Sequence, residues 1–124
     1  MLWNKLYEYP SSMRTSIEGK RHYEITGEKL PSVTTILSAT QSKEKQESIA
    51  KWTAKVGEEQ AIRVRDQAAS RGTNMHLHLE RYILGQGHKD LTDEGQVAGD
   101  MAQVIINKGL CDLSEIWGSE VTLY

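Results

Sequence analysis

The stretch ASRGTNMHLHLERYILG, residues 69–85, governs how the middle of this chain folds. Its apolar side chains recur at helical spacing and predict the core stripe of a helix: Met75, Leu79, Tyr82 and Ile83. Gly72 favours the C-terminal cap of a preceding helix, and Thr73 favours the N-cap of this one. Gly85 is expected to end it.

His76 and Glu80 stand four residues apart, so the predicted helix places them on one face. An imidazole and a carboxylate together can bind Mn²⁺ or another divalent ion, and a histidine can act as a general base. A histidine and a glutamate at this spacing are also typical of an ordinary surface pair, and His76 could instead be a core histidine. His78 lies about 200° around the helix from His76, so the two histidines do not form a chelating pair.

The chain before this stretch predicts strands first and helices later. Residues 1–30 have the alternation and turn glycines, Gly19 and Gly27, of a β-hairpin. Ser32 is expected to cap a short helix. A strand is the alternative, because the residues that follow are β-branched: Val33, Thr34, Thr35 and Ile36. From residue 42 the pattern is firmly helical, with Gly57 as a stop or kink and a further helix over 58–70.

The chain after residue 85 predicts a loop, a helix and a strand. GQGHKDL, residues 85–91, is expected to be a loop. Residues 92–108 predict a helix that ends before Gly109, with four large apolar residues facing inward: Val97, Met101, Val104 and Ile105. The last stretch, EIWGSEVTLY over residues 115–124, alternates like a strand. Its residues 120–124 are expected to form an edge strand that needs a partner: the N-terminal hairpin, a second copy, or another polypeptide.

These elements predict an α+β fold in a single domain over residues 1–124. The order is an N-terminal β-hairpin, several helices and one C-terminal strand. Residues 1–85 carry 13 basic and 10 acidic side chains, and residues 86–124 carry 2 and 7, for a net charge of −2. The mildly basic first part fits either a polyanion partner or an ordinary solvated surface.

Composition also bounds the cellular setting. No stretch approaches the ~20 apolar residues that a membrane span needs, and the N-terminus lacks the apolar region of a signal peptide. Cys111 is the only cysteine, so no disulfide forms within the chain. A cytoplasmic protein without membrane contact is the simplest expectation.

Three segments together resemble a known family. LPSVTTILSAT, then a tryptophan-bearing helix, then AxxRGTNMHxxLERYILG, are similar to the N-terminal half of RecB-like exonucleases of the PD-(D/E)XK superfamily. The resemblance is to the type of the phage exonucleases and the mitochondrial genome maintenance exonuclease, and it covers almost the whole chain. It implies an incomplete restriction-endonuclease-like fold that acts on DNA, in a host cytoplasm if the chain is phage-encoded.

The resemblance also implies roles for individual residues. His76 matches a metal-site histidine, and Glu120 in SEVTLY matches an acidic catalytic and metal-site residue. Gly72 and Thr73 match the turn before that histidine, and Arg71 matches a basic residue that contacts DNA phosphate. Two further candidates for phosphate contacts, equally well explained as solvated helix charges, complete the set: Arg63 and Arg65. Mg²⁺ or Mn²⁺ would be the cofactor, in a completed site only.

The family continues with a G-x-x-D strand and a D-x₍ₙ₎-(D/E)-x-K hairpin, and neither pattern follows Glu120 in this sequence. We therefore expect a fragment or split half of a DNA exonuclease that does not cut DNA alone, completed by a second polypeptide or by self-association through the C-terminal strand. The alternative hypothesis is a non-catalytic module, derived from a nuclease, that binds nucleic acid or a protein.

Overall fold

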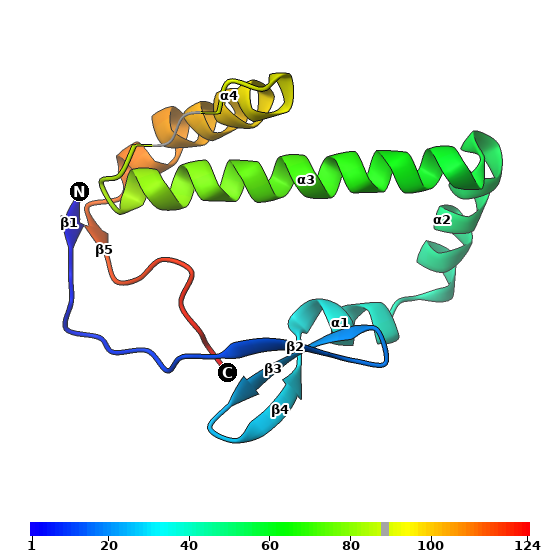
Figure 1. Cartoon of the computed structure of the whole chain (residues 1–124), viewed down its shortest axis with the longest axis horizontal. Helices are drawn as coiled ribbons and strands as arrows, with labels where there is room; N and C mark the ends of the chain where they lie inside the picture. The colour runs from blue at the N-terminus through cyan, green and yellow to red at the C-terminus, as the bar shows by residue number, and fades with distance from the viewer. Residues whose placement is uncertain (88–89) are drawn as a thin grey trace. The chain divides into compact units, whose positions relative to one another are not determined.

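The computed structural model describes residues 1–87 and 90–124, which form two compact units. One unit comprises Met1–Tyr7 with Glu59–Glu120, and the other comprises Glu8–Glu58 with Val121–Tyr124. Strands come first, helices follow and a short strand comes last, so the predicted α+β class and element order are confirmed (Figure 1). The predicted loop over 85–91 includes residues 88–89, which lie outside the described residues.

The predicted N-terminal hairpin is present and carries a third strand. β2 (Met13–Ile17), β3 (Lys20–Ile25) and β4 (Glu28–Pro31) form an antiparallel sheet in that order. Gly19 and Gly27 occupy the connecting turns with φ of +75° and +84°, as the sequence predicted. Two-residue hairpin turns require such positive φ values, which glycine adopts without a steric cost.

Two capped helices follow the sheet. α1 (Val33–Ala39) begins after Ser32, whose Oγ accepts a hydrogen bond of 3.1 Å from a backbone N–H in the first turn. α2 (Lys43–Val56) begins in the same way after Ser42 and ends at Gly57, whose φ is +90°. Both starts and the stop at Gly57 are confirmed, because serine caps and left-handed glycines act through the local backbone.

The structure corrects the prediction of two helices joined at Gly72 and Thr73. α3 (Glu58–Ile83) runs without a break through both residues. Instead of capping a new helix, Thr73 Oγ1 donates a 3.0 Å hydrogen bond back to the carbonyl of Ala69. A glycine within a helix costs only about 1 kcal/mol relative to alanine, so good helix formers on both sides carry the helix across it. The helix ends before Gly85, whose φ is +72° as expected.

α4 (Asp93–Lys108) has the predicted span, with Gly109 beyond its end, but it packs through a different face. The four large residues predicted to face inward are 37–54% exposed: Val97, Met101, Val104 and Ile105. The buried residues are small: Gly95, Ala98 and Ala102. A Cβ added to Gly99 would lie 3.3 Å from the ring of His78 on α3, so the small-residue side of α4 approaches α3 closely at this point. Figure 1 shows α4 beside α3.

The predicted C-terminal strand over EIWGSEVTLY, residues 115–124, is confirmed only at its start, and the expected edge strand over residues 120–124 is wrong. β5 (Glu115–Ile116) pairs in parallel with β1 (Leu2–Trp3), so the chain's own N-terminus supplies the mate. Glu120 has a φ of +53°, which is outside the extended region, and the residues after it form no strand. Alternation alone cannot distinguish a strand from an irregular segment of the same pattern.

The buried apolar set among the described residues is small: Ile25, Ala61, Ala98, Ala102 and Ile116. The predicted core stripe of α3 is only partly covered, because Met75 and Leu79 are half-buried and Tyr82 is 47% exposed. Helical periodicity therefore located the helical segments, although not the continuity of α3, and overstated how deeply their apolar faces are buried.

Candidate functional site

One face of α3 lines a pocket of about 580 Å³. Its wall consists of helix residues at intervals of three and four, together with one residue from near the C-terminus: Ala69, Gly72, Thr73, His76, Leu77, Glu80 and Glu120. Four residues that the resemblance singled out therefore share one pocket. They do so from the middle of a continuous helix rather than from the predicted turn.

His76 and Glu120 face each other across this pocket. Nδ1 of His76 lies 3.8 Å from Oε1 of Glu120, which is beyond hydrogen-bond distance but within reach of an ion pair when the imidazole is protonated. The two side chains are 66% and 59% exposed, so the pair contributes little to stability and is open to a ligand. His76 is not a core histidine, which agrees with the prediction that it projects from the helix.

The segment that carries Glu120 is held by residues from both ends of the chain. The ring of Trp117 lies against that of Tyr7, with centroids 5.0 Å apart and planes inclined by 32°. Just before it, Ile116 is buried in the short sheet formed with Trp3. Figure 1 shows the segment after β5 on the side of α3 opposite α4. A fixed loop, not a strand, thus presents Glu120.

The His76–Glu120 pair fits a divalent ion as a partial ligand set. Imidazole nitrogen suits Mn²⁺ better than Mg²⁺, and carboxylate oxygen suits both. Two donors at about 2.1 Å from an ion lie about 3 Å apart in adjacent octahedral positions, so small side-chain rotations would suffice. Glu80 adds a half-buried carboxylate to the same wall. Within residues 1–87 and 90–124, however, no three potential ligands are already grouped around one point.

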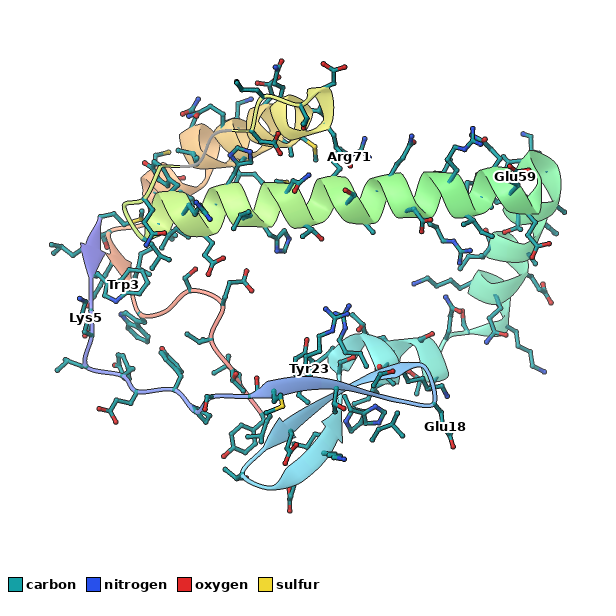
Figure 2. All side chains as sticks on the ribbon, in the orientation of Figure 1. Trp3, Lys5, Glu18, Tyr23, Glu59 and Arg71 are labelled. Carbon is teal, nitrogen blue, oxygen red and sulfur yellow. The ribbon has the colours of Figure 1, made fainter. Side chains whose placement is uncertain are left out.

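The three predicted phosphate-binding arginines occupy different faces of α3. Arg71 points to the α4 side of the helix in Figure 2, about 140° around the axis from His76. Arg63 pairs with Glu59 at 3.8 Å on the exposed surface. Arg65 precedes His76 by three helical turns and shares its face, about 16 Å along the helix. Of these arginines, Arg65 is the one in line with the pocket.

Sequence reasoning missed the aromatic support of Glu120. Tyr7 and Trp117 stand at opposite ends of the chain, and no local pattern links them. The other residues that line the pocket were predictable, because the positions of Ala69 and Leu77 follow from helical spacing once α3 is known to be continuous. The face of a helix is a local property, whereas the Tyr7–Trp117 contact depends on how the chain closes on itself.

Comparisons of the chain with family models, curated proteins and solved structures gave no significant match. Within the described part of the chain, no helix combines the length and the apolar content that crossing a bilayer demands.

Proposed function

We propose that the Met1–Tyr7 and Glu59–Glu120 unit supplies part of the metal site of a Mg²⁺- or Mn²⁺-dependent DNA exonuclease. The observation that supports it is the 3.8 Å approach of His76 to Glu120. The family resemblance requires these two residues to share a site although 43 residues separate them in the chain. Their shared pocket is what such a site needs.

Each residue has a defined task in this proposal. His76 and Glu120 bind and orient the ion, and Glu80 stands beside them as a further carboxylate on the same wall. When bound, the ion neutralises the charge of the scissile phosphate and activates water. Arg65, in line on α3, would hold a phosphate of the same DNA strand some distance from the scissile bond.

Two or three donors do not complete a phosphodiesterase site, so the proposal includes a second contributor. Further carboxylates would come from another segment or polypeptide docked at the pocket, where both known donors are accessible. We expect residues 1–124 alone to degrade no DNA with either ion. Degradation that copurifies with the chain and is lost in His76→Ala would contradict this expectation.

The direct test is Mn²⁺ binding by the whole chain, followed by electron paramagnetic resonance of the free ion. His76→Ala and Glu120→Gln should each weaken binding by about tenfold or more, as expected when a ligand is removed. Two matched controls remove a histidine and a glutamate elsewhere, His22→Ala and Glu47→Gln, and should leave affinity unchanged. Because the ligand set is partial, binding by the unaltered chain should be weak but measurable. Equal effects in all four variants, or no detectable Mn²⁺ binding, would refute the metal site.

A non-catalytic binding module is the second candidate, and the packing of α4 favours it. This helix buries its small residues and leaves a row of large apolar side chains exposed: Val97, Met101, Val104 and Ile105. Such a face is typical of helices that meet another protein. The Mn²⁺ measurement separates the candidates, because a module of this kind has no need for His76 and Glu120 to bind an ion.

A further inference from the structure

A second candidate site lies in the other unit, where the β2–β3 hairpin meets α1. Two adjoining pockets, of about 350 and 440 Å³, share Gly19 and Arg21. Three basic residues line them: Arg14, Lys20 and Arg21. Five hydroxyl residues complete the lining: Thr15, Ser16, Thr34, Thr35 and Ser38. No carboxylate belongs to either lining, so both pockets present donors and positive charge.

The strand register brings the two arginines to one face of the sheet. Ser16 pairs with Arg21, and Arg14 pairs with Tyr23, so Arg14 and Arg21 are diagonal neighbours. Diagonal neighbours lie about 7–8 Å apart, and like charges so placed repel. Both side chains are exposed, and within the described residues neither of them, nor Lys20, takes part in an ion pair.

Glu18, which stands two residues before Lys20 in the sequence, does not compensate this charge. Glu18 occupies the turn between β2 and β3 and is absent from both pocket linings. Figure 2 shows its side chain pointing away from α1. Arg21 lines both pockets, Lys20 lines one and Arg14 the other, so an anion in either pocket would meet two cations without a competing carboxylate from its lining.

The backbone beneath the pockets is fixed before any ligand arrives. The carbonyl of Arg21 accepts hydrogen bonds from the Ser32 N–H at 3.1 Å and from Thr35 Oγ1 at 2.9 Å. Ser32 is 8% exposed and also caps α1, so one buried serine ties the helix to the strand. This arrangement holds Arg21 against the hydroxyl residues of α1 and lowers the entropy cost of binding.

We infer that these paired pockets bind consecutive phosphates of a single-stranded nucleic acid. Guanidinium groups match phosphate oxygens with two parallel hydrogen bonds, and hydroxyl groups donate further ones. Two pockets that share Arg21 suit neighbouring phosphates of one strand better than an isolated phosphate ion. The half-buried ring of Tyr23, opposite Arg14 in register, offers a surface for a base to stack on. This inference rests on the proposed function only for the choice of DNA as the probe.

The test is a fluorescence-anisotropy titration of a labelled oligothymidylate with the whole chain, in EDTA and at several salt concentrations. Arg14→Ala/Arg21→Ala should lower affinity about tenfold or more at low salt. It should also reduce the slope of log affinity against log salt by about 1.4, since each single-strand phosphate contact contributes about 0.7. Lys43→Ala/Lys45→Ala removes the same charge from exposed positions of α2 and should change affinity by less than twofold.

Equal losses in the two double variants would show a general charge effect and overturn the site, and so would unchanged binding in the arginine variant. Because the arginine variant can perturb the sheet, amide chemical shifts of the unaltered chain provide a second measurement. Oligothymidylate should shift Gly19, Arg21 and Thr35, and shifts confined to other residues would reject the inference. If a nucleic-acid strand is the ligand, inorganic phosphate should compete only weakly with oligothymidylate. Full competition at an equal concentration of phosphate groups would show that the pockets bind isolated phosphate and would reject the inference.

His76→Ala separates this inference from the proposed function. It should weaken Mn²⁺ binding by about tenfold or more and leave oligothymidylate binding in EDTA unchanged. Retained Mn²⁺ binding in His76→Ala, together with loss of DNA binding in the arginine variant, would refute the metal site alone. Loss of Mn²⁺ binding in His76→Ala, together with unchanged DNA binding in the arginine variant, would refute the nucleic-acid site alone.

Discussion

The two candidate sites are built by different parts of the chain in different ways. The His76–Glu120 pocket depends on contacts between residues far apart in sequence, and the Tyr7–Trp117 ring pair supports the segment that carries Glu120. The Arg14–Arg21 pockets depend on a hairpin and the helix that follows, all within residues 13–39. Long-range contacts have a larger ordering cost than local ones. The metal pocket should therefore be the more fragile of the two.

The largest effect expected is on the stability of the unit that holds the metal pocket. A Cβ at Gly95 would overlap the side chain of Asp90, whose Oδ1 also accepts hydrogen bonds from Thr92 N and Oγ1 at the start of α4. Gly95→Ala should lower the free energy of unfolding by about 1–3 kcal/mol. Urea denaturation followed by circular dichroism measures this change.

Oligothymidylate binding should survive Gly95→Ala, since the arginine pockets belong to the other unit. Gly99→Ala is the matched control, because its Cβ would make only a tight contact, 3.3 Å from the His78 ring. A smaller loss for Gly95→Ala than for Gly99→Ala would contradict the packing described for α4.

A second variant tests whether the ring pair positions Glu120. Trp117→Ala removes the partner of Tyr7 without removing any proposed ligand. An aromatic pair contributes about 0.5–1.5 kcal/mol, so Mn²⁺ affinity should fall by about two- to tenfold. Trp52→Ala, on the exposed side of α2, is the control and should leave Mn²⁺ affinity intact. Unchanged affinity in Trp117→Ala would mean that Glu120 is held by other contacts.

A third pair of variants separates helix capping from the arginine pockets. Ser32 and Ser42 both cap a helix through the side chain, and Ser32 also donates its N–H to the carbonyl of Arg21. Replacement of either by alanine should cost about 1 kcal/mol. Ser32→Ala keeps that N–H but should in addition weaken oligothymidylate binding by about threefold, because Ser32 Oγ also hydrogen-bonds to Thr35 Oγ1, which donates to the carbonyl of Arg21. Equal DNA affinity in the two variants would show that the Ser32 cap does not support the arginine pockets.

Much of the fold was predictable where local chemistry decides it. Ser32 and Ser42 begin helices, and Gly57 and Gly85 end them, because caps and left-handed glycines act within a few residues. The packing face of α4 was not predictable from its pattern. Its large apolar stripe and its small-residue stripe are both periodic, and only the long-range contact of Gly99 with the His78 ring places the small-residue stripe against α3.

The candidate site was predictable only in part. His76 and Glu80 share a face by helical spacing, which any reading of the helix reveals. That Glu120 joins them followed from the family resemblance and from nothing local, since its backbone is not the predicted strand. The arginine pockets went unnoticed because Arg14 and Arg21 become neighbours only once the strand register is known.

The smallest expected effect tests the continuity of α3, on which the metal pocket depends. Gly72 lies in the middle of this helix, and a Cβ added there would meet no atom within 4 Å. Gly72→Ala should therefore raise the free energy of unfolding by about 0.5–1 kcal/mol, because alanine has the higher helix propensity and loses less backbone entropy. Gly85→Ala is the matched opposite, since φ is +72° there and the same substitution introduces strain. If α3 instead broke at Gly72, as capping rules alone predict, both variants would be destabilised. Stabilisation of the first and destabilisation of the second would establish that His76 projects from the middle of one continuous helix.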